Sequence, residues 1–71
     1  MKLPIVSGFD AVKALTKAGF EIKRRKGSHV VLQKGIIVLS VPLHRTLKKG
    51  TLRAIIRQAG LTVEEFLELL S

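Results

Sequence analysis

A run of four cations leads through a glycine to a histidine, and this segment is the one best suited to chemistry. It consists of Lys23, Arg24, Arg25, Lys26, Gly27, Ser28 and His29. Histidine is the side chain whose ordinary pKa suits proton transfer near neutral pH. A polyanion held by the four cations would lie across the imidazole. These residue types therefore indicate a site at which His29 moves a proton on a bound, phosphate-rich molecule.

RNA is the polyanion for which this small set is sufficient, because its 2′-hydroxyl is already a nucleophile. One well-placed base and a few cations can then cleave the chain without a metal ion. Ser28 does not complete a triad with His29, since neighbours on a strand point to opposite faces. The alternative interpretation is that His29 only contacts nucleic acid or solvent and performs no chemistry.

A second basic junction precedes another predicted helix, at Lys48, Lys49, Gly50, Thr51, Leu52 and Arg53. Free amides and a partial positive charge make a helix N-terminus suitable for phosphate. The alternative is an ordinary helix start capped by Thr51 or a neighbour, and the two interpretations are compatible. The other histidine, His44, is either a second acid or base or a loop residue with a structural role.

The charge is unevenly distributed along the 71 residues. Thirteen Lys and Arg against five Asp and Glu give a net charge of +8. Residues 22–57 contain no acid, and they carry ten of the cations: Lys23, Arg24, Arg25, Lys26, Lys34, Arg45, Lys48, Lys49, Arg53 and Arg57. A uniformly solvated surface would mix the two signs, so this distribution indicates a partner rich in phosphate or an acidic protein.

Several function classes are excluded by composition. The chain has no cysteine and only two histidines, which leaves no zinc finger or thiolate metal site. Glu64 and Glu65 are adjacent on a predicted helix and diverge, so the convergent carboxylates of a two-metal nuclease are missing. No nucleotide-binding motif is present. We therefore expect neither metal nor cofactor, and a single domain over residues 1–71. The apolar run at 35–41 is too short for a membrane span, which favours a cytoplasmic protein.

The spacing of capping and apolar residues predicts the helices and strands. Ser7 and Asp10 form a capping box for a helix over 8–18, with Phe9, Val12 and Leu15 on its apolar face. Gly19 suits the left-handed helix end.

Strands are predicted over 20–24, 29–33 and 36–41, joined by short glycine turns into an antiparallel meander. The apolar run of the third strand indicates that it is well covered, and Pro42 ends it. Alternation places His29, Val31 and Gln33 on one face, which we expect to point away from the helices.

Two more helices follow. One opens at Gly50 and Thr51 and carries Leu52, Ile55, Ile56 and Ala59 on its apolar face; the other begins with a second capping box, from Thr62 to Glu65. The predicted fold class is α+β, in the order α-β-β-β-α-α, with the helices on one face of a three-stranded antiparallel sheet.

Together these residues resemble the HicA family of toxins from HicA–HicB toxin–antitoxin modules. The resemblance lies in the segments Pro4-Ile5-Val6-Ser7-Gly8, Ala18-Gly19-Phe20, Lys26-Gly27-Ser28-His29, Val41-Pro42-Leu43-His44 and Gly50-Thr51-Leu52-Arg53, the last of which continues to Leu61. It implies a fold like the double-stranded RNA-binding domain, which is α-β-β-β-α and here gains one C-terminal helix.

The resemblance also implies a function. Members of this family are toxins of type II systems that cleave mRNA without metal, which would make His29 the catalytic general acid or base. The expected RNA-binding residues are Lys23, Arg24, Arg25, Lys26, Gly27, Ser28, Lys48, Lys49 and Arg53. A HicB-like antitoxin would cover the site and inhibit it. Two alternatives remain: a non-catalytic module that recognises RNA by shape, and a basic face that serves chiefly as a protein–protein surface.

Overall fold

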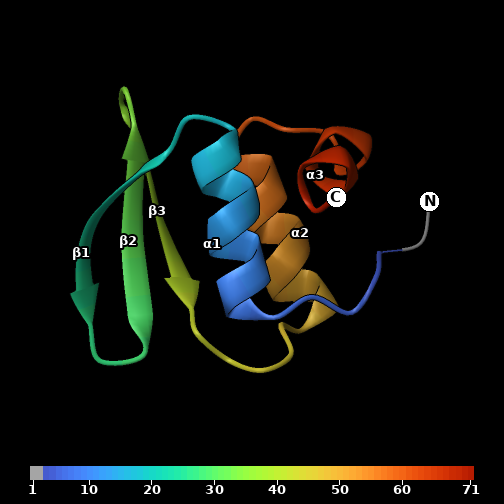
Figure 1. Ribbon diagram of the computed structural model, residues 1–71, viewed down its shortest axis with the longest axis horizontal. Helices are drawn as coiled ribbons and strands as arrows, with labels where there is room; N and C mark the ends of the chain where they lie inside the picture. The colour runs from blue at the N-terminus through green and yellow to red at the C-terminus, as the bar shows by residue number, and fades with distance from the viewer. Residues whose placement is uncertain (1–2) are drawn as a thin grey trace.

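The computed structural model describes residues 3–71, and the fold has a sheet on one side and helices on the other (Figure 1). The elements are α1 (Gly8–Lys17), β1 (Glu21–Lys26), β2 (His29–Lys34), β3 (Ile37–Pro42), α2 (Lys49–Gln58) and α3 (Val63–Leu69). In Figure 1, α1 and α2 lie beside the sheet and α3 lies farthest from it. The predicted α+β fold, with the order α-β-β-β-α-α and a three-stranded antiparallel sheet, is confirmed.

The central strand of the sheet is β2, which pairs antiparallel with β1 and β3. Each hairpin turns on a glycine at φ 59°, Gly27 in one and Gly35 in the other, and no other residue type adopts a positive φ among the described residues. A positive φ at the first turn position alone is the type II′ arrangement. Such tight turns keep the ladder paired to its end, so β1 and β2 extend to Lys26 and Lys34, beyond their predicted limits.

An irregularity in β1 changes which side chains share a face. Glu21 and Ile22 pair with Gln33 and Leu32, but the next paired residue is Arg24, so the register shifts at Lys23. One extra residue in a strand is a β-bulge, and it reverses the alternation beyond it. Arg24 and Lys26 therefore lie on the face of the sheet opposite to Ile22. Without the bulge, simple alternation would place all three side chains on one face.

The sheet buries only one face. Val30 and Leu32 of β2 and Leu39 and Val41 of β3 are all at most 5% exposed, while Val38 is 57% exposed. The prediction that the third strand is well covered is therefore wrong. Its apolar run suggested cover on both faces, but the helices lie on one face alone, and the other face is open.

The first helix contacts the sheet through small residues. Ala11, Ala14 and Leu15 are fully buried, whereas Phe9 is 56% exposed. Placing Phe9 on the buried face was therefore wrong, because the helix packs through its alanine stripe and Phe9 lies to one side of it. The amide of Asp10 donates to the Ser7 hydroxyl at 3.0 Å, which is one half of the predicted capping box.

The second helix begins earlier than expected. It starts at Lys49, with Lys48 as an N-cap that makes no side-chain capping bond, so Thr51 lies inside the first turn instead of opening it. Its predicted apolar face is confirmed, since Leu52, Ile55 and Ile56 are at most 4% exposed.

The third helix begins at the predicted capping box. The Glu65 amide donates to Thr62 Oγ1 at 3.1 Å, and the Thr62 amide donates to Glu65 Oε1 at 2.8 Å. Phe66, one residue further along, is fully buried. The helix is therefore fixed at its start by two reciprocal bonds and by one aromatic side chain in the core.

One cation of the acid-free stretch has a structural role. Lys34 Nζ donates to the Ala18 carbonyl at 2.6 Å, at the C-terminal end of α1, and lies 5.9 Å from the centre of the Phe20 ring. A cation at a helix C-terminus is favourable. We expect Lys34→Met to lower the free energy of unfolding by about 1 kcal/mol in urea titrations. Lys23→Met, with the same change of charge at the exposed bulge, should leave the midpoint unchanged; equal losses would contradict this role.

Candidate nucleic-acid interface

The first β-hairpin places His29 on the open face of the sheet. His29 is exposed at the start of β2 and lies between Lys26 of β1 and Pro42 of β3 in the ladder. The neighbouring β2 residues Val30 and Leu32 point into the core. The prediction that the His29 face points away from the helices is therefore confirmed, and nothing in the described chain covers the imidazole on that side.

The four consecutive cations do not form one patch. Arg24 and Lys26 pair with Val31 and His29, so they share the open face with the histidine. Arg25 pairs with the buried Val30 and lines a groove on the helix side instead. Lys23 is the bulge residue. Two of the four therefore lie beside His29, and Arg25 is on the opposite face.

Backbone hydrogen bonds tie the histidine end of the sheet to the helices. The Leu43 amide donates to the Ser28 carbonyl at 2.6 Å, which fixes the turn before His29 to the residue after β3. The Gly8 amide donates to the His44 carbonyl at 2.9 Å. The β1–β2 turn, the end of β3 and the starts of α1 and α2 thus gather at one end of the molecule (Figure 1).

His44 contributes its backbone to this end. Its carbonyl accepts the Gly8 bond, while its side chain is exposed in the loop between β3 and α2. This bond involves the backbone alone, so both interpretations of the imidazole remain open. The start of α2 lies at the same end, and Lys48 and Lys49 are exposed there with no side chain capping the helix amides.

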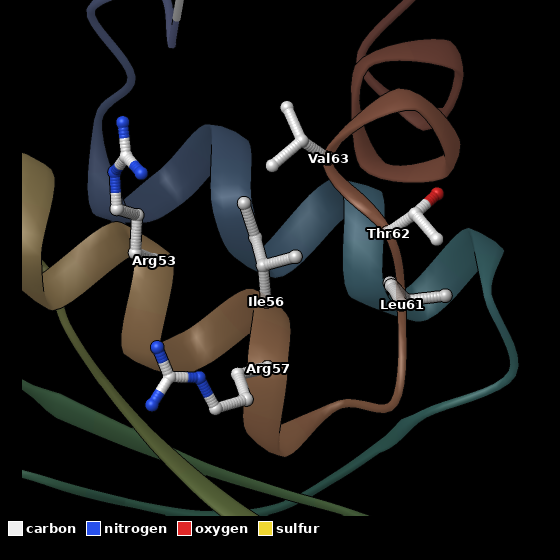
Figure 2. A pocket seen from close by; sticks show the side chains of 6 residues that line it. All are labelled: Arg53, Ile56, Arg57, Leu61, Thr62 and Val63. Carbon is white, nitrogen blue, oxygen red and sulfur yellow. The ribbon is translucent and has the colours of Figure 1, made fainter. Parts of the chain in front are cut away.

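The cation Arg53 lies elsewhere. It lines a pocket between α2 and α3 together with Arg57, Ile56, Leu61, Thr62 and Val63. Figure 2 shows both guanidinium groups extending from α2, with Val63 and Thr62 on the facing segment. Arg53 shares a face of α2 with Lys49, one turn earlier, but this pocket belongs to the helical layer, so Arg53 does not lie on the open sheet face that carries His29.

Phe9, Lys13 and Ile22 line the same groove as Arg25 and were not predicted as site residues. The one signal for this groove in the sequence is the aromatic Phe9 in the first turn of α1, whose spacing is also that of a core residue. Among residues 3–71, no three His, Asp or Glu side chains converge as metal ligands would.

The protein is thus a small basic α+β domain with an exposed histidine on an open, cationic sheet face. A family model for the HicA toxin of bacterial toxin–antitoxin systems matches residues 8–61. The chain belongs to this HicA toxin family, and it is therefore the toxin of a module that includes an antitoxin partner. A search of curated proteins returned no match. None of the helices described within residues 3–71 is long and apolar enough to span a bilayer.

Proposed function

We propose that this toxin domain, formed by residues 1–71, is an endoribonuclease of a type II module that cleaves mRNA in the cytoplasm without metal. The observation that carries the proposal is the position of His29, exposed on an open face and flanked in the ladder by Lys26. Membership of the HicA toxin family adds independent support. A long RNA can lie across an open face, whereas a deep pocket in so small a domain would not accommodate it.

His29 is the group that moves the proton. The 2′-oxygen of a ribose attacks the adjacent phosphorus, and the bond from phosphorus to the 5′-oxygen of the next nucleotide breaks. His29 takes the proton of the attacking hydroxyl or supplies one to the leaving oxygen, and solvent water on the open face exchanges the other proton. Arg24 and Lys26, on the same face, hold the phosphates beside it and offset the charge that develops on the phosphoryl oxygens.

The remaining predicted contacts serve binding at a distance from the chemistry. Lys48 and Lys49 extend the basic end at the start of α2, where free amides favour phosphate. Gly27 and Ser28 form the turn that leads into His29. Lys23, Arg25 and Arg53 add to the field that attracts RNA but lie on other surfaces, so we expect them to contribute less.

The salt dependence of RNA binding tests which of these cations contact phosphates. A protein that neutralises several phosphates loses affinity steeply with salt. Arg24→Gln and Lys26→Gln should each reduce the slope of log K against log salt by about 1, measured by fluorescence anisotropy with labelled RNA. Lys17→Gln, at the far end of α1 where Lys17 bonds the Ser71 carbonyl, should leave the slope unchanged. If the slope falls equally in all three variants, RNA does not bind preferentially to the open face that carries His29.

We also propose that a HicB-like antitoxin inhibits the enzyme by covering the open face. The cations that attract RNA would attract an acidic protein surface in the same way. Addition of the antitoxin to a cleavage reaction should protect the RNA in proportion to complex formed. If the antitoxin binds while cleavage continues at the same rate, the masking model is wrong.

A further inference from the structure

An apolar groove lies between α1 and β1, on the helix side of the sheet. Phe9 and Val12 of α1, Ile22 of β1 and Leu43 after β3 line it, and its volume is about 270 Å³. Phe9 and Ile22 are 56% and 54% exposed. Single exposed apolar residues are ordinary, whereas exposed apolar residues that line one concavity form a patch of the kind found at binding sites.

The groove also carries two positive charges. Lys13 and Arg25 line it and both are exposed. An occupant of the groove must therefore combine an apolar group with negative charge on either side of it.

We propose that this groove seats an apolar side chain of the antitoxin, flanked by acidic residues that pair with Lys13 and Arg25. The inference rests on the antitoxin partnership stated above, and it assigns the partner a contact separate from the catalytic face. A buried apolar anchor with charges at its rim is the common arrangement of a tight protein interface.

A nucleobase fits the groove less well. Four of its lining side chains are aliphatic: Val12, Ile22, Val30 and Leu43. Lys13 and Arg25 could donate to a base, but none of the lining side chains can accept a hydrogen bond from the amino or imino groups of a base, and leaving these groups without partners is costly. An apolar side chain has no such groups, so the lining favours a protein occupant.

The position of the groove explains how one partner reaches His29. Arg25 lies in β1, an edge strand, and is paired next to the Lys26–His29 pair. Arg24 and Lys26 project from the opposite face of the same strand. An antitoxin anchored in the groove therefore needs only to pass over the edge of β1 to cover the histidine.

Affinity measurements with purified antitoxin from the same module test the proposal. We expect Phe9→Ser to raise the dissociation constant about 10-fold or more, and Lys13→Glu about fivefold. Matched controls are Ile36→Ser, a 98% exposed residue in the β2–β3 turn, and Arg57→Glu in the pocket between α2 and α3. Both should remain within twofold of the wild type. Thermal unfolding of each variant checks the fold, and Lys13→Glu, on the surface of α1, keeps the test valid should Phe9→Ser unfold.

Each outcome separates this inference from the nuclease proposal. Unchanged antitoxin affinity in Phe9→Ser and Lys13→Glu overturns the groove. Loss of RNA affinity in Phe9→Ser, with antitoxin affinity kept, assigns the groove to RNA and also overturns it. If the wild type does not bind the antitoxin, the groove proposal is wrong. RNA cleavage by the same preparation would still support the nuclease proposal. Weakened antitoxin binding by a toxin that cuts no RNA supports the groove alone.

Discussion

Replacing His29 with alanine is expected to reduce RNA cleavage by at least 100-fold, the usual range for loss of a general acid or base being about 10²–10⁴. Growth inhibition should be lost as well. RNA affinity should stay within about threefold, because the cations Arg24 and Lys26 on the same face remain. The residue is exposed and makes no side-chain hydrogen bond in the described structure, so the fold should be unaffected. Cleavage is measured with labelled RNA, and binding by anisotropy on the same preparation.

The other histidine supplies the matched control. His44→Ala removes an exposed imidazole from the same end of the molecule while its backbone bond to Gly8 remains. We expect it to keep most of the activity. Full cleavage by His29→Ala would remove the catalytic assignment, and intact RNA with both variants and with wild type would favour the non-catalytic binding module.

Gly8→Ala should destabilise the domain strongly. Gly8 begins α1 against the end of β3, where a Cβ atom would collide with the Pro42 carbonyl oxygen and lie 2.8 Å from Leu43 Cα. Both are backbone atoms, so no side chain can rotate away. The helix start must shift, which also strains the Gly8 bond to the His44 carbonyl. We expect a loss of about 3 kcal/mol or more, a large share of the roughly 4–10 kcal/mol available to a domain of this size.

Gly50→Ala is the control for that substitution. Gly50 lies in the first turn of α2, and a Cβ there would have no atom within 4 Å. Alanine should leave stability unchanged or raise it by about 0.5 kcal/mol, since glycine is a poor helix former. Urea unfolding followed by circular dichroism gives both midpoints. If the two variants unfold at the same urea concentration, the close contact between α1 and the end of β3 does not contribute to stability as we expect.

Patterns among residues close in the sequence were sufficient to predict much of the fold. Thr62 and Glu65 cap α3 as their spacing predicts, and the glycines of the two hairpins adopt the positive φ that tight turns require. The orientation of His29 also followed from alternation, because Val30 and Leu32 beside it are plainly core residues. These features depend on residues within a few positions of one another.

Features set by distant contacts were not predictable in the same way. The bulge at Lys23 leaves no mark in a strand whose residues are nearly all polar, so the division of the cations between two faces could not be seen. Phe9 has the spacing of a core residue, and it is exposed because α1 packs through Ala11 and Ala14 and leaves Phe9 to one side. Arg53 was predicted as a site residue because it adds charge beside a predicted helix N-terminus, and the packing of α2 against α3 places it at a pocket in the helical layer instead.

Metal-independent cleavage through the 2′-hydroxyl can be tested with RNA whose 2′-hydroxyl groups are methylated. Purified toxin is incubated in EDTA with unmodified RNA and with 2′-O-methyl RNA of the same sequence, and binding and cleavage are both measured. We predict that both RNAs bind and that only the unmodified one is cut, because the substrate supplies the nucleophile and His29 moves its proton. Cleavage of the methylated RNA, or cleavage of unmodified RNA only after a metal ion is restored, would contradict this prediction.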